Sequence, residues 1–381
     1  MEYKKLGDIA TYINGYAFKP EQRGSEGLPI IRIQDLTGNA YDLGYYNGDY
    51  PKKIELNDGD VLISWSASLG VYLWNRGKAL LNQHIFKVVF DKVEIDKFYF
   101  MYAVEYNLDK MSLKTHGATM KHITKKDFDN VVIPYPDLDY QKEISYRLTS
   151  LKGIIEKYQE QLDLLDELIK ARFVEMFGDP NIEFKYSSVK FNDLVARMTK
   201  GPFGSDMKKD LFVPKGEDTY KVYIQINAIQ KNQSLGEYYI SKEYFDRKVS
   251  RFELFPNDYI ITCDGTLGKY LKLDENMEKG VISPSLLRLT LQNDKINDKY
   301  FENIWDFYML GLMKKEARNA CLVHLPSAKK IGEISIPVPP LELQNQFASF
   351  VEEVDKSRSR IQKSLEASQE LFDSLMQKYF G

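Results

Sequence analysis

The sequence is poor in the residues that crosslink small domains or bind metal. Its 381 residues include two cysteines, Cys263 and Cys321, and four histidines. Two cysteines are too few for a disulfide framework or a cysteine-based zinc site, and no histidines stand at the spacing of zinc ligands. We therefore expect both cysteines to be reduced packing residues, and we expect no metal site.

Long apolar runs are also missing. No stretch of about 18 apolar residues occurs, and Met1–Asp8 lacks the apolar core of a secretion signal. With 43% apolar residues and a net charge of -3, the composition is that of a globular protein. We expect a cytoplasmic protein, and at roughly 100 to 200 residues per domain the length predicts two or three domains.

Catalytic motifs are absent too. No glycine-rich loop ends in Gly-Lys-Ser or Gly-Lys-Thr, so a P-loop is unsupported. The Asn/Asp-Pro-Pro-aromatic tetrad of amino-methyltransferases does not occur. The acids of Pro136–Lys142 have the wrong spacing for a nuclease carboxylate cluster and suit the N-terminus of a helix. The chain is therefore predicted to be non-catalytic.

What the sequence does contain is an internal repeat. Ile133–Pro136 recurs as Ile336–Pro339, and Phe177–Gly178 recurs as Phe380–Gly381, both 203 positions later. Matches further upstream have shorter offsets, so insertions fall inside the globular parts. A fixed long period of this kind indicates two copies of one structural unit.

The tail of each copy carries a heptad pattern. Apolar residues follow one another at alternating steps of four and three, which is the spacing of a coiled-coil seam. The seam residues are Leu148, Leu151, Ile155, Leu162 and Leu165 in the first tail and Val351, Val354, Ile361, Leu365 and Phe372 in the second. Because the first tail leads into the second globular part and the second tail starts there, two paired helices must run antiparallel.

The globular parts are β-rich. Short runs of β-branched and aromatic residues are separated by Gly, Asn, Asp and Pro turns and followed by a helical stretch in each copy. We therefore predict an α+β fold with two pseudo-two-fold-related modules, 1–138 and 180–340. An antiparallel coiled coil of two long helices, 139–179 and 341–381, separates them. Helices of about 40 residues would hold the modules up to about 60 Å apart.

Positive charge gathers at matching positions of the two copies. Lys110–Lys126 holds five lysines and no acid, and Lys314–Lys330 holds five basic residues against one acid. A third stretch, Arg197–Lys215, has five basic residues against two acids. A single run is usually a solvated face, but repetition in both copies favours a surface that contacts nucleic-acid phosphates.

Polar side chains around these stretches suit the reading of base edges. Arginine suits guanine, glutamine and asparagine suit adenine, and lysine suits phosphate. Each such residue also fits an ordinary turn or sheet surface. The candidate DNA contacts of the first module are Tyr16, Lys19, Arg32, Gln34, Ser64, Trp65, Ser66, Lys114, His116, Thr119, Lys121 and His122. Those of the second module are Lys200, Phe203, Ser205, Lys208, Gln225, Asn227, Asp264, Thr266, Arg318, His324 and Lys329.

Together these features resemble those of a known family. The chain is similar, over essentially its whole length, to the DNA-specificity subunit of type I restriction-modification systems. The matching motifs are Ile336–Gln344 at the start of the second long helix, Lys121–Ile123 with its counterpart His324–Pro326, and the strands at Asp60–Leu62 and Asp258–Ile260. The first module departs at Pro136–Tyr140, where a second proline and Glu-Leu are commoner in the family.

The resemblance implies a function. In this family the two modules are target recognition domains that each read half of one bipartite double-stranded DNA site, and the helices set the spacer between the halves. The subunit itself is non-catalytic and binds no cofactor. It directs two methyltransferase subunits, which bring S-adenosylmethionine, and restriction subunits, which use ATP and Mg²⁺. No membrane is involved.

Two other functions stay open on the residues alone. One is a stand-alone nuclease, which magnesium-dependent cleavage of a plasmid by the pure protein would reveal; the missing acid cluster argues against it. The other is a coiled-coil scaffold that carries two protein-binding modules. Direct DNA binding by the assembled complex would separate that scaffold from a DNA reader.

The Lys121→Ala substitution is expected to weaken DNA binding to all sequences alike. Because one phosphate contact is lost, the slope of log affinity against log salt should fall by about one. Binding titrations over a range of salt concentrations measure this slope. An unchanged slope would show that Lys121 contacts no phosphate.

Overall fold

The computed structural model describes residues 2–39, 42–114, 123–179, 182–231, 236–319 and 324–381. The chain forms two compact units. Unit one comprises Met1–Glu160 with Ile361–Gly381, and unit two comprises Gln161–Arg360. Each unit contains one globular module and the nearer part of each long helix. Along the described residues, no helix has both the length and the apolar character that a membrane span requires.

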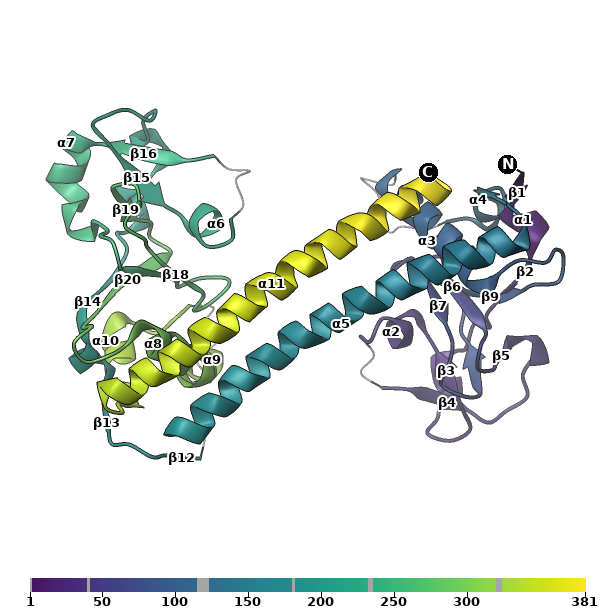
Figure 1. Cartoon of the computed structure of the whole chain (residues 1–381), viewed down its shortest axis with the longest axis horizontal. Helices are drawn as coiled ribbons and strands as arrows, with labels where there is room; N and C mark the ends of the chain where they lie inside the picture. The colour runs from purple at the N-terminus through teal and green to yellow at the C-terminus, as the bar shows by residue number, and fades with distance from the viewer. Residues whose placement is uncertain (1, 40–41, 115–122, 180–181, 232–235, 320–323) are drawn as a thin grey trace. The chain divides into compact units, whose positions relative to one another are not determined.

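The larger sheet of each module has four antiparallel strands. In unit one the strand order is β2-β9-β6-β7, and in unit two it is β14-β20-β17-β18. The strands of the first sheet are β2 (Thr11–Asn14), β6 (Val61–Ser64), β7 (Gly70–Leu73) and β9 (Ile85–Val89). Those of the second are β14 (Val195–Lys200), β17 (Tyr259–Thr262), β18 (Tyr270–Lys272) and β20 (Leu286–Leu291). The two sheets therefore share one topology. Strands β6, β7 and β9 of the first sheet and β14, β18 and β20 of the second are labelled in Figure 1.

A smaller mixed sheet also occurs in both modules. Its order is β4-β3-β8-β5 in unit one and β16-β15-β19 in unit two, and the pairs β3·β8 and β15·β19 are both parallel. The strands are β3 (Leu28–Ile31), β4 (Gly44–Tyr46), β5 (Glu55–Leu56), β8 (Ala79–Leu81), β15 (Thr219–Tyr223), β16 (Tyr238–Ser241) and β19 (Gly280–Ile282). The smaller sheets of the two modules thus agree in the order of their shared strands and in the direction of each pairing. This agreement is what the internal sequence repeat predicts.

Two-stranded ladders close each module beside its long helix. They pair β1 (Tyr3–Lys5) with β10 (Val132–Pro134) and β13 (Ser188–Lys190) with β21 (Ser335–Pro337). A third ladder, β11 (Gly178–Asp179) with β12 (Glu183–Phe184), follows the first long helix. The short helices are α1 (Leu6–Ile9), α2 (Ile33–Leu36), α4 (Lys125–Asp129), α6 (Gln225–Ala228), α7 (Lys242–Tyr244) and α10 (Ala328–Gly332).

One longer helix packs on the larger sheet of each module. In unit one it is α3 (Lys97–Lys114), which is continuous. In unit two the counterpart is α8 (Asp298–Ile304) and α9 (Leu310–Asn319), joined by a π-helical turn at Trp305–Met309. The difference shows that the two copies have diverged inside an element that both retain.

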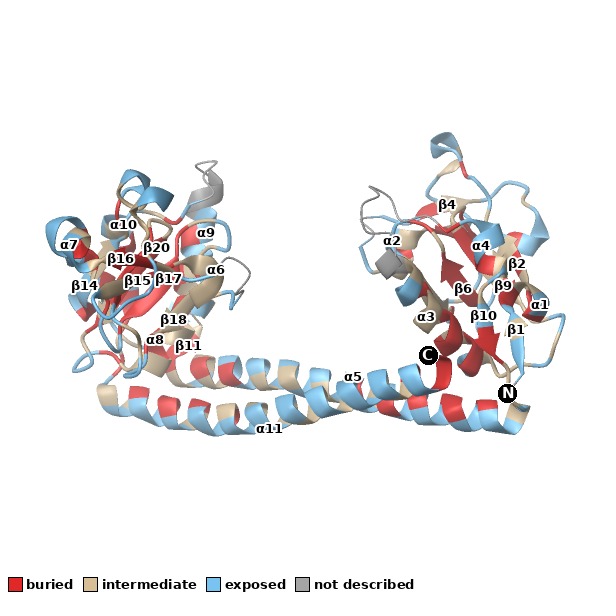
Figure 2. Cartoon of the chain, turned by 90° about the horizontal axis from the view of Figure 1, so that it is seen from above, coloured by how far each residue is buried: buried red, intermediate tan, exposed pale blue. Residues whose placement is uncertain are grey.

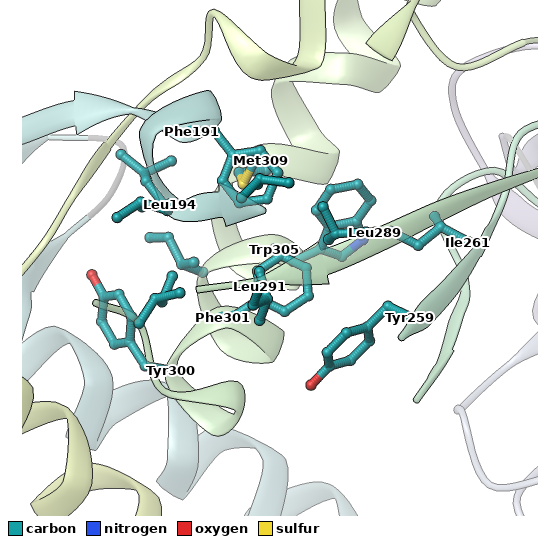
Figure 3. Packing of buried hydrophobic residues seen from close by; sticks show 14 of the residues in the cluster. Phe191, Leu194, Tyr259, Ile261, Leu289, Leu291, Tyr300, Phe301, Trp305 and Met309 are labelled. Atoms are coloured by element: carbon teal, nitrogen blue, oxygen red, sulfur yellow. The ribbon is translucent and has the colours of Figure 1, made fainter. Parts of the chain in front are cut away.

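Aromatic side chains join this helix to the sheet in unit two (Figure 3). Phe301 of α8 stacks on Phe191 with ring centroids 5.8 Å apart, and its edge contacts the ring of Tyr259 at 5.1 Å. Trp305 lies 5.7 Å from Phe301, and its indole N–H donates a 2.9 Å hydrogen bond to the carbonyl of Gly268. This packing fixes the position of strand β17 and of the loop that follows it.

The two long helices are α5 (Leu138–Phe177) and α11 (Leu341–Phe380). In unit one the first turns of α5 meet the last turns of α11, where Ile144 and Leu148 share a core with Phe380. In unit two the last turns of α5 meet the first turns of α11. Opposite ends therefore pair, which confirms the predicted antiparallel arrangement.

Buried and half-buried residues together form a stripe along each helix, buried toward the ends and half-buried midway (Figure 2). None of the ten predicted seam residues is exposed. They are fully buried near the modules, as at Leu148 and Val351, and half-buried midway along the helices, as at Leu162 and Leu365. The gradient has a simple cause: near the modules a seam residue packs on the module core as well as on the other helix, and midway it has the other helix alone.

A glycine ends α5. Gly178 has a φ of 92°, a left-handed conformation that favours glycine at the C-terminus of a helix. A Cβ atom at this position would lie 2.4 Å from the carbonyl oxygen of Glu183. The glycine thus lets the chain leave the helix and pair as β11 with β12.

Phe347→Ala is expected to destabilise unit two by about 3 to 5 kcal/mol, because a fully buried aromatic ring is removed. Phe347 contacts the rings of Phe173 and Phe177 at centroid distances of 5.6 and 5.4 Å. The midpoint of urea unfolding measures the loss. The matched control is Leu164→Ala at an exposed position of α5, where the change should stay within about 0.5 kcal/mol. Equal midpoints for the two variants would contradict the prediction.

Candidate nucleic-acid interface

One edge of the larger sheet of unit two collects the ends of several segments. Strands β14 and β17 both run antiparallel to β20, so both end beside the start of β20, where Lys200 pairs with Leu287 and Thr262 pairs with Leu286. The chain at His324 joins the same edge through a bridge to Asp264. Loops that are distant in sequence are therefore neighbours there.

Hydrogen bonds connect predicted contact residues along this edge. The amide of Gln225, at the start of α6, donates to the hydroxyl of Thr266 at 3.0 Å. Nδ1 of His324 lies 2.5 Å from a carboxylate oxygen of Asp264. The structure thus brings together four residues that the sequence analysis proposed from three separate segments.

Lys200 is electrostatically coupled to the same loop. Burial raises the pKa of the Cys263 thiol to about 11, and the positive charge of Lys200 opposes that shift. Cys263 is buried, in accord with its predicted packing role, whereas Lys200 is exposed. The lysine can therefore present its charge to a ligand while the cysteine fills the interior.

The remaining predicted residues of unit two differ in accessibility. Phe203 is 76% exposed, which is unusual for an aromatic residue, and its neighbours Ser205 and Lys208 are exposed as well. Lys329 is exposed on α10. Asn227 is half-buried and donates its side-chain amide to the carbonyl of Gly236, so it shapes a loop instead of facing outward.

The corresponding edge of unit one has the same construction. The N–H of Trp65, just after β6, donates to the carbonyl of His84 at 3.3 Å, and its own carbonyl accepts from the N–H of Ile123 at 3.1 Å. In unit two, Cys263 makes the equivalent pair of bonds with Ser285 and Leu325. Trp65 also stacks on the ring of Phe86 at 5.5 Å.

Two predicted contacts of unit one, Ser64 and Ser66, are buried. The hydroxyl of Ser64 donates to the carbonyls of Ser66 and Ser68, so it fixes the turn. In this conformation neither hydroxyl is presented for a base contact, and the serines act by shaping the loop that carries Trp65.

Arg32 and Gln34 have different surroundings although they are neighbours. The guanidinium of Arg32 is bonded to the Asp35 carboxylate at 3.1 Å and to the carbonyl of Asp42. Its hydrogen bond to Asp35 also raises the pKa of Arg32. Gln34 is exposed on α2. A guanine contact by Arg32 would require these bonds to break. The side chain of Gln34 is accessible to a base without any such rearrangement.

The loop after β2 presents Tyr16 and Lys19, which are both exposed. Tyr16 rests edge-on against Phe18 with ring centroids 4.9 Å apart. His116, Thr119, Lys121 and His122 lie outside the described residues, as do the side chains of Lys114 and Arg318. No group of three or more potential metal ligands occurs among the residues that are described.

Two glycines allow the loops to cross the sheet edge. A Cβ atom on Gly15 would lie 1.9 Å from the carbonyl oxygen of Asn82, and one on Gly201 would lie 2.0 Å from that of Ser283. Both glycines directly follow the first strand of the larger sheet. The sequence analysis proposed contact residues in these loops but did not predict that the glycines are needed for close approach of the backbone. The matching positions of the two glycines in the two copies could have indicated it.

Sequence reasoning also missed a cation beside the repeated aspartate of each larger sheet, half-buried at Lys87 and buried at Arg288. Lys87 forms a 2.8 Å ion pair with Asp60 and donates to the carbonyl of Glu55. Arg288 takes the same place in unit two and donates to the carbonyl of Glu253. The repeated aspartates at 60 and 258 were the available signal, but the sequence does not show which cation faces them.

The sequence matches the family described as the type I restriction modification DNA specificity domain, over residues 1–165 and 204–369. Because the match covers most of the chain, the chain belongs to this family. It is a specificity subunit, which recognises the target of a type I restriction-modification system and assembles with the methyltransferase and restriction subunits. The subunit is not itself catalytic.

Individual relatives agree with this membership. The type I restriction enzyme EcoBI specificity subunit of Escherichia coli is 22% identical over 420 residues, which cover 98% of this chain and 84% of the relative. The crystal structure of the type I S subunit from M. genitalium is 14% identical and covers 100% of this chain and 96% of its own, with a TM-score of 0.57. A chain from a structure of type I complex assembly and conformational transition is 13% identical, with coverage of 99% and 97% and a TM-score of 0.58. These two likenesses show a common fold.

Gly201→Ala is expected to lower the melting temperature and to weaken DNA binding, because the added methyl group would overlap the carbonyl of Ser283. Gly204→Ala is the matched control in the same loop, since no atom lies within 4 Å of its added Cβ. Thermal unfolding and DNA retention on native gels measure both effects. Identical behaviour of the two variants would rule out the close approach at Gly201.

Proposed function

We propose that the two modules read the two halves of one bipartite double-stranded DNA target. The observation that carries this proposal is the repetition of one sheet edge. In each unit the ends of two strands, the start of a third and a short helix gather exposed polar and basic side chains in the same topological place. Two equivalent readers in one chain fit a target with two separated recognition elements.

The accessible side chains divide into two roles. Gln34 is exposed on α2 and suits the N6 and N7 groups of adenine. Gln225 is half-buried on the equivalent helix α6 and would suit the same groups once its amide releases the hydroxyl of Thr266. Lys19, Lys200, Lys208 and Lys329 are exposed and suit phosphate. The exposed ring of Phe203 suits apolar contact with a thymine methyl group. Arg32, Ser64 and Asn227 would support the loops that carry these contacts.

The long helices would set the number of base pairs between the half-sites. An α-helix of 40 residues is about 60 Å long, and two such helices packed along a seam resist bending. Base pairs between the two readers would then carry no base-specific contact. Their number would be selected by the length of the helix pair.

The partners supply the chemistry. We propose that two methyltransferase subunits, with bound S-adenosylmethionine, and restriction subunits, with ATP and Mg²⁺, assemble on this chain. The chain itself would contribute DNA recognition and bind none of these cofactors. Work on DNA with these partners would place it in the cytoplasm. Family membership supports the assembly.

Deleting four residues from the middle of α5 and four from the middle of α11 is expected to shorten the preferred spacer. Four helical residues correspond to about 6 Å, or roughly two base pairs. Selection of binding sites from random duplexes, with the complete methyltransferase complex, measures the half-sites and the spacer together. The half-sites should stay the same.

A deletion in one helix alone is the control, because it breaks the pairing register and should reduce binding at every spacer. Selection of a single undivided motif by the wild-type complex would refute the bipartite proposal. An unchanged spacer in the double deletion would refute the role of the helices.

A further inference from the structure

Each long helix carries a buried glutamine in its first turn. Gln141 is 1% exposed and Gln344 is 0% exposed, and they stand 203 positions apart, in the register of the internal repeat. A buried side-chain amide must satisfy its hydrogen bonds inside the protein. The partners of these two amides therefore show what they hold together.

In unit one the amide of Gln141 joins two helix starts. Its carbonyl oxygen accepts a 2.9 Å hydrogen bond from the backbone N–H of Asp96, directly before α3. Its NH₂ group donates a 2.8 Å bond to the carbonyl of Pro136, two residues before the start of α5. The Asp96 carboxylate in turn accepts from the N–H of Tyr99, so the same residue caps α3.

Unit two repeats this arrangement with different neighbours. The carbonyl oxygen of Gln344 accepts a 2.8 Å bond from the N–H of Asn297, the N-cap of α8. Its NH₂ group donates to the carbonyls of Pro339 at 2.8 Å and Lys295 at 3.2 Å. The same amide geometry at both sites, with an aspartate cap in one and an asparagine cap in the other, argues for a common purpose.

The junction of each module with the start of a long helix is called the joint. A tyrosine adds a second bond at each joint. The hydroxyl of Tyr99 donates to the carbonyl of Pro134, and that of Tyr300 donates to the carbonyl of Pro337, both at 2.8 Å. These bonds join α3 and α8 to the strands that lead into the long helices. Hydrogen bonds are directional, whereas the surrounding apolar contacts are not. The amide and hydroxyl bonds therefore restrict the angle between module and helix.

The joint lies at the opposite end of the sheet from the candidate DNA contacts. Lys97, the first residue of α3, bonds to the carbonyl of Gly59, which precedes the start of β6, whereas Trp65 follows its end. In unit two, Asp298 of α8 accepts from the hydroxyl of Tyr259 at the start of β17. A small tilt of the module on its long helix would thus move the candidate DNA-contacting edge. The hydrogen bonds within that edge would stay intact.

We infer that Gln141 and Gln344 are positioning residues that fix the orientation of each module on its long helix and thereby make the protein selective for spacer length. The inference rests on the proposed bipartite function. Neither glutamine contacts DNA, and neither is needed for a module to recognise its half-site. By fixing the two modules on their helices, the glutamines allow both modules to bind their half-sites together at one spacer length and at few others.

The test uses Gln141→Leu and Gln344→Leu in the complete methyltransferase complex. Leucine has a similar size but forms none of the amide bonds. Affinity is measured for duplexes that carry the selected target with its native spacer, the same target with one base pair added or removed, and one half-site alone. The preference for the native spacer should fall by about tenfold, whereas half-site affinity should stay within about twofold.

Two control variants, Gln159→Leu and Gln346→Leu, make the same exchange at exposed positions of α5 and α11 and should leave the preference unchanged. If a leucine variant does not fold, Tyr99→Phe and Tyr300→Phe replace it. Phenylalanine keeps the packed ring but loses the hydroxyl bond to the carbonyl of Pro134 or Pro337, and should lower the preference by about threefold.

The possible outcomes separate this inference from the proposed function. A folded variant that keeps the full spacer preference overturns the inference. So does a variant whose affinity for one half-site falls as much as its affinity for the complete target. A wild-type complex without any bipartite preference overturns the proposed function instead. Loss of spacer preference with intact half-site binding supports both.

Discussion

The burial of side chains from both long helices inside each module is the constraint on which the rest of the structure depends. In unit one, Ile144 of α5 and Phe380 of α11 belong to the core that also contains the strands of the larger sheet. In unit two, Phe347 of α11 and Phe177 of α5 take these places. Neither module completes its apolar core without both helices. The coiled coil is therefore part of two domains and cannot be regarded as a linker added to finished ones.

Polar side chains at the candidate interface are used in two distinct ways. Some are consumed by the fold: the Arg32 guanidinium bonds to Asp35, and the Ser64 hydroxyl bonds to backbone carbonyls in its own turn. Others, such as Gln34 and Lys208, are exposed. A loop that reads DNA must first be held in one shape, so the consumed side chains supply preorganisation and the exposed ones supply contact.

Features that are periodic or repeated along the chain can be predicted from the sequence. The role of a side chain whose bonding partner is distant in the sequence cannot. The heptads predicted both long helices, because a seam depends only on spacing along the chain. The order of modules and tails along the chain predicted that the helices run antiparallel. The matching motifs predicted two related modules. The bond from the Arg32 guanidinium to the carbonyl of Asp42 could not be predicted, because these two residues meet only after folding. Gln344 was visible as part of a motif, but its partner Asn297 stands 47 positions upstream, and nothing local indicates that the two meet.

The division of the chain between the units has a consequence for biosynthesis. Unit two is one continuous stretch, Gln161–Arg360, so it can fold as soon as that stretch has left the ribosome. Unit one needs Ile361–Gly381 to cover its core, although its first 160 residues are made first. The earlier-synthesised module is thus the later one to mature, and its uncovered apolar surface is open to chaperones throughout translation.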